Sequence, residues 1–476
     1  MSSTTFESTG KTEMRLDMAT WLNAWQSLRD RNHETVLLDG DGMKLTALLM
    51  NCSTGSMVAI ETPVPSLPSP SRMPAQPSHL GMQDTLIAEQ WLANGSPSLA
   101  WKTPELPPVR GKGLFTYPLG PVRADVSESL YYELTVMGDE IIRLNLNPGF
   151  KRRHIREWVR GRTIDEAMPI ISRFTTTSNV HHTLAMALAV EDAWNLPIAM
   201  EVHETRTLLA ELERAESHLG DLALLAVSTG LPVPQMEYLH LKETLLRVNS
   251  RLFGHRYLRD SIVPGGLDST LWPGGVHPRH EATVVARVRD EAARIADGLM
   301  RTSSFLDRLH GAGTVPKDTI SAMRPVGPIG RASGRAFDVR TVRSYAAYLD
   351  ADLRIPVEQN ADAYARFRIR VRELDESLSL IQRMLGAWTP PALASTPRGL
   401  GVPVRGHGVG IVEAPRGMLA YRLQVDSSGR IGHLGVATPS QRNWPTLPSA
   451  MANGNILQDF PIVDASFALS VAGWDG

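Results

Sequence analysis

The residues best suited to chemistry lie between Arg173 and Glu191, where hydroxyl side chains run into two histidines and then into the apolar run Leu184–Val190. A polar loop that enters an apolar helix is typical of a site loop held by a buried element. His181 and His182 could relay protons, because imidazole titrates near neutral pH. No cysteine or carboxylate stands beside them at ligand spacing, so we favour histidines satisfied in a core or interface over metal ligands.

A second group of reactive side chains repeats along one predicted helix. Glu211, Arg214 and His218 are separated by three and four residues, which places them on one helix face and lets Glu211 pair with Arg214. They could form the polar rim of an active site. We favour a buried ion-pair network that joins helices, because charges inside a protein need partners.

Two further charged segments follow. The first contains Arg331, Arg335, Asp338 and Arg340, with Gly330 and Gly334 as flexible points. It has no preceding strand and no P-loop spacing, so we set a phosphate-binding role aside. The second is the turn from Glu413 to Gly417. Its Arg416 either faces a pocket or binds backbone carbonyls, and both interpretations stay open.

Composition excludes several functions. The chain has 476 residues, a formal net charge of -1 and one cysteine, Cys52, so it offers no disulfide framework and no thiolate-held metal cluster. The charge balance gives no reason to expect nucleic acid as a partner. The basic group Lys151–His154 has no interleaved aromatic residues and is typical of a solvated or subunit-facing surface. No run of about 20 apolar residues could span a bilayer, so we expect a cytoplasmic protein that meets membranes through partners.

Periodicity predicts the elements that position these residues. Helices are expected over Met18–Leu28, His154–Gly161, Asp165–Arg173, Val180–Trp194, Glu201–Val227, Met236–Phe253, His280–Leu309 and Val357–Leu385. Strands are expected over Thr35–Leu38, Leu45–Met50, Tyr131–Val136, Glu140–Leu146, Gly408–Glu413, Leu419–Val425 and Ile431–Val436. Prolines between residues 63 and 77 and between 104 and 108 predict extended linkers. The fold class is α+β, a bundle of long helices with a peripheral β-hairpin and C-terminal strands.

Several motifs occur in a fixed order along this framework. They are Gly120-Pro-Val-Arg123, Leu208-Leu-Ala-Glu-Leu-Glu-Arg-Ala-Glu-Ser-His-Leu219, Val326-Gly-Pro-Ile-Gly-Arg-Ala-Ser-Gly334, Glu413-Ala-Pro-Arg-Gly417 and Asn443-Trp-Pro-Thr446. From about Leu114 onward the chain thereby resembles the large-subunit family shared by energy-converting nickel–iron hydrogenases of the formate hydrogenlyase type and the 49 kDa quinone-site subunit of respiratory complex I. The resemblance implies three parts: a degenerate complex I 30 kDa-like α/β domain over residues 1–80, a linker over 81–112 and the large-subunit domain over 113–476.

The chain departs from this family at the metal ligands. The first ligand motif, Arg-x-Cys-Gly-x-Cys, aligns with Arg173–Ser178, and its following histidine aligns with His182. Thr175 and Ser178 therefore replace thiolates. The second motif, Asp-Pro-Cys-x-x-Cys, aligns with residues 468–473, where Ser470 and Gly473 replace the cysteines. We call these two stretches the first segment and the second segment. A neutral hydroxyl cannot replace the soft thiolate that nickel and iron require, so we expect no metal.

The complex I branch of the family offers a different chemistry, in which a histidine and a tyrosine hold a quinone. Arg123 and Thr176 occupy those positions here. Hydroxyl and imidazole groups can still hydrogen-bond a carbonyl, so a quinone remains conceivable. Its expected cavity would be lined by Thr175, Thr176, Ser178 and Ser470, with His182, Arg123 and Arg416 as candidate contacts.

The resemblance also implies partners: an iron–sulfur small subunit whose cluster faces the loop from Arg173 to His182, and antiporter-like membrane subunits. Electrons would pass from that cluster, which this chain does not hold, to a quinone-like acceptor. The alternative is a non-catalytic scaffold or coupling subunit of the same complex. Under either hypothesis, Glu211, Arg214, His218, Arg331, Asp338 and Glu413 form a structural polar network.

Overall fold

The computed structural model describes residues 6–8, 11–15, 24–25, 27–28, 33–40, 44–51, 56–63, 111–122, 128–268, 277–343, 345–348, 351–388, 403–404 and 406–475. Most of the two proline-rich stretches, most of the helix expected over Met18–Leu28, and Arg123 lie outside these residues. The long helices and the small sheets expected from the sequence are present, so the α+β fold class is confirmed.

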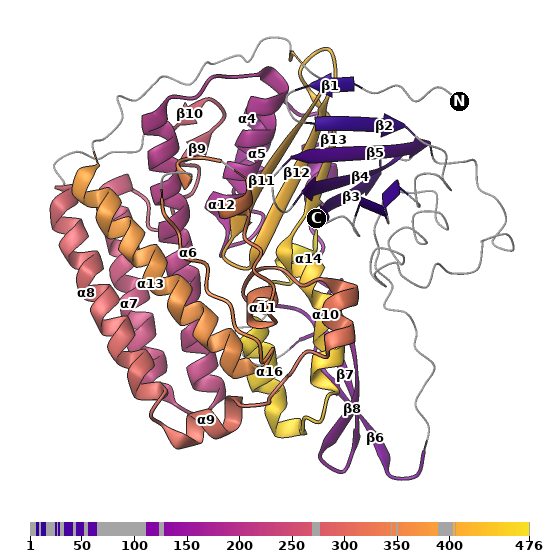
Figure 1. Ribbon diagram of the computed structural model, residues 1–476, viewed down its shortest axis with the longest axis vertical. Helices are drawn as coiled ribbons and strands as arrows, with labels where there is room; N and C mark the ends of the chain where they lie inside the picture. Colours follow the sequence, from indigo (N-terminus) through magenta and orange to yellow (C-terminus); the bar gives the residue numbers. More distant parts are fainter. Residues whose placement is uncertain are drawn as a thin grey trace, which may run out of the picture.

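Long helices form the main body of the molecule (Figure 1). They are α6 (Met200–Ser228), α7 (Pro232–Phe253), α8 (Pro278–Leu299) and α13 (Ala363–Ala387). Helix α6 packs against α7 and α13, and its residues from Thr205 to Leu219 are buried on every side. A helix surrounded by protein in this way can carry charged side chains only if their partners come from its neighbours.

Several of the expected helix boundaries are wrong, including the start of α7, which lies at Pro232 rather than at Met236. The single helix expected over His280–Leu309 is two helices, α8 and α9 (Ser303–Leu309), separated by a turn that follows Gly298. Glycine is a poor helix former, so it weakens the last turn of α8. Helix α13 begins at Ala363, because Asp362 accepts a hydrogen bond from the amide of Ala365 at 2.8 Å and caps the helix there.

The C-terminal sheet lies directly on helix α5 (Asn179–Trp194). Its antiparallel strands are β11 (His407–Ala414), β12 (Gly417–Val425) and β13 (Ile431–Ala437). A Cβ atom at Gly408 or Gly410 would lie 1.9 Å from a carbonyl oxygen of α5, so only glycine allows the strand to approach the helix this closely. Helix α5 is thereby fixed between β11 and the bundle.

Two other sheets contain most of the remaining described strands, and β9 (Ile262–Val263) pairs with β10 (Gly266–Leu267) in a small sheet of two strands. The expected hairpin is β7 (Tyr131–Met137) and β8 (Glu140–Asn147), joined by an unexpected edge strand, β6 (Leu114–Leu119). The N-terminal sheet contains β1 (Phe6–Ser8), β2 (Lys11–Arg15), β3 (His33–Gly40), β4 (Lys44–Asn51) and β5 (Met57–Pro63), in the order β1-β2-β5-β4-β3. Strand β3 contacts β12 and β13. The 30 kDa-like identity of this region stays a prediction.

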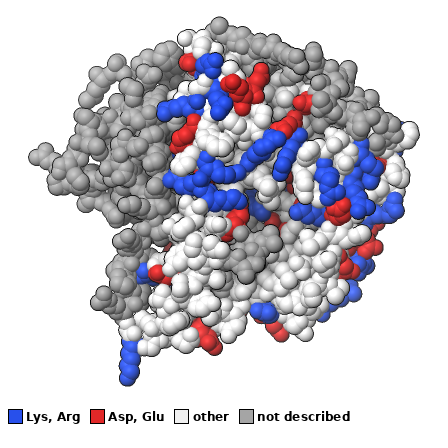
Figure 2. Space-filling view, turned by 180° about the vertical axis from the view of Figure 1, so that it is seen from behind, with Lys and Arg blue, Asp and Glu red and all other residues white. Residues whose placement is uncertain are grey.

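The remaining elements are short. They are α3 (Ile155–Val159), α4 (Ile164–Ile171), β9 (Ile262–Val263), β10 (Gly266–Leu267), α10 (Lys317–Met323), α11 (Gly327–Ala332), α12 (Val339–Val342), α14 (Pro439–Asn443), η3 (Trp444–Thr446), α15 (Leu447–Met451), η4 (Leu457–Asp459), α16 (Phe460–Phe467) and η5 (Ala472–Asp475). No helix in the described ranges is both long and apolar enough to cross a membrane. Figure 2 shows the opposite face, where Lys and Arg side chains gather in groups with Asp and Glu among them.

Candidate functional site

The first segment lies in the loop between α4 and α5. Thr175 and Ser178 are buried, whereas Thr176 is exposed. The Thr175 hydroxyl has no hydrogen-bond partner among the described residues. Glu213 on α6 holds the start of α5: its carboxylate accepts the amides of Val180 at 2.9 Å and His181 at 3.0 Å. A negative charge at a helix N-terminus stabilises the helix, so Glu213 fixes where the loop ends.

Both histidines of this region are inside the protein. His181 Nδ1 lies 2.6 Å from Glu213, and His182 Nδ1 lies 2.6 Å from the hydroxyl of Tyr421 on β12. The His182 ring stacks on Phe174 with the ring centroids 4.4 Å apart. Burial, with the nearby charges of His181 and Arg153, lowers the pKa of His182 to about 3. His182 is therefore neutral at physiological pH and held in place by its neighbours.

The second segment is held by an acidic side chain that precedes β7. The Glu128 carboxylate accepts the Ser470 hydroxyl at 3.3 Å and the Ala472 amide at 3.1 Å, and it also accepts the amide of Val471. Lys151 lies 3.1 Å from the same carboxylate. The turn therefore already has an anionic ligand, supplied by the protein itself.

Gly473, the other aligned ligand position, has little room for a side chain. A Cβ atom there would lie 3.2 Å from the Cβ of Ser440 and 3.3 Å from its hydroxyl oxygen. Separations this short require the neighbouring atoms to shift. The backbone of the second segment thus fits a glycine at position 473 against Ser440.

Arg416, at the turn between β11 and β12, connects both segments to helix α6. Its Nε donates to the carbonyl of Ala468 in the second segment. Its Nη1 donates to the Thr177 hydroxyl at 2.8 Å in the first segment and to the Ser217 hydroxyl at 3.2 Å. Its Nη2 donates to Asp221 at 3.0 Å. Arg416 therefore binds a backbone carbonyl, as one of the two sequence interpretations expected, and it lines none of the three cavities described below, so the pocket-facing interpretation gains no support from them.

A second arginine joins the two segments from the side of α3. The Nη1 of Arg153 donates to the carbonyl of Arg173 at 2.9 Å, and its Nη2 donates to that of Phe174. Its own amide donates to Asp475 at 2.7 Å, and the amide of His154 donates to the same carboxylate at 3.1 Å. The two segments are thus fastened together by Arg153 and Asp475 as well as by Arg416.

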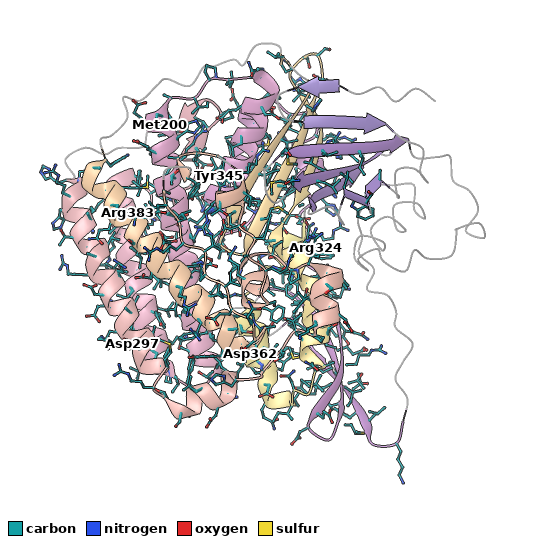
Figure 3. The ribbon with its side chains drawn as sticks, in the orientation of Figure 1. Met200, Asp297, Arg324, Tyr345, Asp362 and Arg383 are labelled. Carbon is teal, nitrogen blue, oxygen red and sulfur yellow. The ribbon has the colours of Figure 1, made fainter. Side chains whose placement is uncertain are left out.

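A buried ion network lies behind the two segments. Arg331 is surrounded by three carboxylates, Glu373 at 2.6 Å, Glu413 at 2.8 Å and Asp338 at 3.1 Å. Burial and the neighbouring charge of Asp338 raise the pKa of Glu413 to about 7, because one guanidinium cannot compensate three carboxylates. Tyr345, labelled in the interior in Figure 3, accepts the Glu413 amide at 3.0 Å.

The network continues along α6 through Arg340 and Glu211. Arg340 pairs with Asp338 at 2.8 Å and with Glu211 at 3.2 Å, and Arg214 pairs with Glu211 at 3.2 Å. Burial opposes ionisation of Glu211, but the two arginines and two hydroxyl donors outweigh it, so its pKa lies below the usual value.

The geometry favours one of the two sequence interpretations for this helix face. His218, from the same face, lies 3.1 Å from Glu373. Glu211, Arg214, His218, Arg331, Asp338 and Glu413 therefore lie in one connected set of buried ion pairs. These contacts match the network interpretation rather than an exposed polar rim.

Sequence reasoning missed several residues that hold the site. They are Glu128, Arg153, Glu213, Glu373, Tyr421 and Asp475. A weak signal existed for Glu213, since it lies within the motif that carries Glu211 and Arg214. Glu128 and Asp475 gave no signal, because their partners lie more than 300 residues away along the chain.

The site offers few donors of the kind that hold a metal. The described part of the chain contains no group of three or more His, Cys, Asp or Glu side chains placed to bind one. Three cavities, of about 470, 590 and 370 Å³, lie among the long helices. None of these three is lined by Thr175, Ser470 or Arg416. The oxygens and glycine at the aligned positions do not fit a thiolate-held nickel–iron centre.

Comparison with known proteins finds one matching family model and several similar proteins. Residues 229–398 match the family model described as "Respiratory-chain NADH dehydrogenase, 49 Kd subunit". The chain is 25% identical over 356 residues to the carbon monoxide-induced hydrogenase of Rhodospirillum rubrum, a match that covers 73% of this chain and 96% of that protein. It is 26% identical over 378 residues to an NADH-quinone oxidoreductase subunit of Chloroherpeton thalassium, a match that covers 73% of this chain and 84% of that one.

Two further similarities extend the picture. Formate hydrogenlyase subunit 5 of Escherichia coli is 25% identical over 350 residues, covering 73% of this chain and 61% of that protein. A chain in the structure of the membrane-bound sulfane sulfur reductase, an archaeal respiratory membrane complex, superposes with a TM-score of 0.71 at 23% identity. It covers 77% of this chain and 99% of the other, which shows the fold. Over about three quarters of its length, the chain is therefore similar to the complex I 49 kDa subunit and to its hydrogenase relatives.

Proposed function

We propose that this chain is a peripheral scaffold subunit of a membrane-bound, complex I-related assembly and holds no nickel–iron centre. The observation that carries the proposal is the set of contacts made by Arg416. Its guanidinium binds the first segment, the second segment and α6 at once, through Ala468, Thr177, Ser217 and Asp221. Protein side chains thereby make the connection between segments that a metal would otherwise make.

Two other contacts support the same conclusion. Glu128 takes the place of an external ligand at the turn of the second segment, and Asp475 binds the amides of Arg153 and His154. A carboxylate that accepts two or three backbone amides forms strong charge-assisted hydrogen bonds. These contacts support a second segment whose position does not depend on a cofactor.

The partners that this proposal names are an iron–sulfur small subunit beside the first segment and antiporter-like membrane subunits. Relatives of this chain carry the names of hydrogenase and NADH-quinone oxidoreductase subunits, and a structural neighbour belongs to a respiratory membrane complex. The buried ion network gives the subunit a rigid body, because an arginine with several carboxylate partners has few alternative positions.

The metal part of the proposal is tested by elemental analysis. The full chain is produced in a host that assembles nickel–iron hydrogenases, with a known hydrogenase large subunit purified in parallel as the positive control. We expect nickel far below one atom per chain, while the control is loaded. Nickel at stoichiometric level that survives dialysis would contradict the proposal.

The scaffold part is tested by assembly. Arg416→Gln removes the charge that joins the segments, whereas Arg247→Gln changes an exposed arginine on α7 and serves as the control. We expect the first variant to lower the yield of partner subunits that co-purify with a tagged chain, and the control to leave it unchanged. Thr177→Val and Ser217→Ala, which each remove one contact of Arg416, give intermediate losses and guard against simple unfolding. Unchanged assembly in all of these variants would refute the scaffold function.

A second function has one observation in its favour. The Thr175 hydroxyl is buried and without a partner among the described residues, so it could donate to a carbonyl oxygen of a quinone-like acceptor reduced by electrons from the iron–sulfur partner. Equilibrium titration of the purified complex with a quinone analogue separates the two functions. Saturable binding that weakens in Thr175→Val supports the redox function. Absence of saturable binding would contradict the redox function and favour the scaffold function.

A further inference from the structure

The turn that ends α3 is tied to the turn that begins β13. The amide of Gly161 donates to the carbonyl of Ile431 at 2.7 Å, and the amide of Ile431 donates to the carbonyl of Arg162 at 2.9 Å. These paired hydrogen bonds hold two surface turns side by side. The two turns are about as far apart in the sequence as the first and second segments are. The backbones of the two turns are therefore fixed relative to each other.

Three arginines on these turns use one N–H each to bind a backbone carbonyl. Arg160 Nε donates to Gly432 at 3.1 Å. Arg162 Nε donates to Trp158 at 2.6 Å. Arg430 Nη1 donates to Gly161 at 2.9 Å. All three side chains are exposed, and a guanidinium has five N–H donors, so each arginine is held in one orientation with donors left over.

Arg162 and Arg430 interact electrostatically with Glu166, and Arg430 with Asp426, but none of the three arginines forms a close ion pair within the described ranges. No carboxylate among the described residues lies within 4.0 Å of any of the three guanidinium groups. Glu166 and Asp426 are nearby, but they accept hydrogen bonds from the backbone amides of their own turns, Thr163 for the former and Ser428 and Arg430 for the latter. Both carboxylates are thus already engaged as caps.

Other exposed arginines of this protein behave differently. Arg173 pairs with Asp260, Arg251 with Glu281, Arg289 with Asp375 and Arg294 with Glu237, each at 3.0 Å or less. Arg383 is also exposed and binds a backbone carbonyl, that of Ala351 at 3.2 Å, but the α3 and β13 turns bring three such arginines together. Beside them, Trp158 is 59% exposed. Tryptophan and arginine are the residues that most often dominate the energy of a protein interface.

We infer that Trp158, Arg160, Arg162 and Arg430, which we name the Trp158 patch, form a docking surface for a partner protein that presents a short acidic segment with an apolar side chain. The free N–H groups would bind carboxylates in pairs, and the indole would cover the apolar side chain. Two acidic residues, Glu166 and Asp426, lie beside the arginines of the patch and interrupt its positive charge. Such interruption favours a compact acidic peptide over the continuous phosphate track of a nucleic acid.

The proposal is tested by selecting peptides from a random display library on the immobilised full chain. Peptides that bind elsewhere on the protein are removed by counter-selection on a double variant, Arg160→Glu with Arg430→Glu. We expect the selected peptides to be enriched in Asp and Glu around a Leu, Phe or Trp residue, and to bind more weakly as salt rises. Selected peptides without acidic enrichment would overturn the proposal.

Binding of the best peptide is then measured by fluorescence polarisation. Trp158→Ala and Arg160→Ala are each expected to weaken binding about tenfold. Arg247→Ala and Tyr257→Ala, which change exposed side chains elsewhere, serve as matched controls and should not alter it. Equal affinity in patch and control variants would refute the patch. Patch-dependent binding of an oligouridylate or of phosphatidylglycerol vesicles, in place of the peptide, would overturn the proposal by showing that the surface recognises a different class of partner.

Discussion

Arginines serve two opposite purposes in this protein, in the buried site and in the Trp158 patch. Arg331 and Arg416 are 0% and 9% exposed, and each is surrounded by carboxylates, hydroxyls or carbonyls from distant parts of the chain. Arg160 and Arg430 are exposed and bind one carbonyl each. An arginine therefore joins buried parts of the chain when protein groups accept all of its N–H donors. It can form part of a docking surface when some of these donors stay free.

The difference has a thermodynamic reason. A buried guanidinium must recover its desolvation energy from partners, and loss of one partner leaves an uncompensated charge in a medium of low dielectric constant. An exposed guanidinium keeps its hydration and contributes little to folding, so its free donors remain available for binding. Substitutions of buried arginines should therefore lower stability, whereas substitutions in the Trp158 patch should weaken binding and leave stability nearly unchanged.

The strongest test of this comparison is Arg331→Met. The substitution leaves three buried carboxylates without their shared cation, so we expect the free energy of unfolding to fall by about 3–5 kcal/mol. Urea denaturation monitored by circular dichroism measures it. Arg294→Met, which removes an arginine whose side chain is 58% exposed, should cost far less, because an exposed ion pair contributes little to stability. Similar losses in both variants would remove the distinction between buried and exposed arginines.

Measuring the free energy of unfolding over a range of pH tests the buried state of His182. Its pKa is about 3 in the folded protein and about 6.5 when unfolded, so below pH 6.5 the unfolded state binds the extra proton. Stability contributed by the neutral ring is therefore complete above pH 6.5 and is lost as the pH falls toward 3. In His182→Gln, the slope of unfolding free energy against pH should decrease by up to about 1.4 kcal/mol per pH unit between pH 6 and 4. An unchanged slope would mean that His182 is not buried as a neutral group.

Glu213→Gln tests the carboxylate that caps α5. Loss of its charge weakens the bonds to the amides of Val180 and His181 and to the His181 ring, so we expect a loss of about 1–3 kcal/mol. Thermal unfolding compares it with Glu237→Gln, an acid whose side chain is 37% exposed on α7. Hydrogen exchange at the start of α5 should accelerate in the first variant. Exchange that stays as slow as in the wild type would argue against the cap.

The smallest effect is expected for Arg160→Ala. Its guanidinium makes one surface hydrogen bond, to Gly432, so unfolding free energy should change by less than about 0.5 kcal/mol. The same variant should nevertheless weaken binding of the selected acidic peptide. Calorimetry of unfolding and peptide titration on one protein preparation measure both. A large loss of stability would show that Arg160 supports the fold rather than a partner.

Sequence patterns identified much of this molecule in advance. The helices of the bundle and the C-terminal strands follow from apolar periodicity, and the ordered motifs pointed to a resemblance that the comparisons confirm. The network of Glu211, Arg214 and Arg331 was expected as buried ion pairs, because charged residues at core spacing need partners. The break after Leu299 was not expected, since a turn between two helices of the same apolar pattern leaves only a weak local signal.

The chain by itself determined which atoms stand at the aligned ligand positions: the hydroxyls of Thr175, Ser178 and Ser470, and no side chain at Gly473. That choice is local and chemical, so it can be read from residue types. Tertiary structure decided what holds those positions together. Arg416 reaches Thr177 across 239 residues and Glu128 reaches Ser470 across 342. Contacts between such distant residues depend on how helices and sheets pack, and no local pattern encodes that packing.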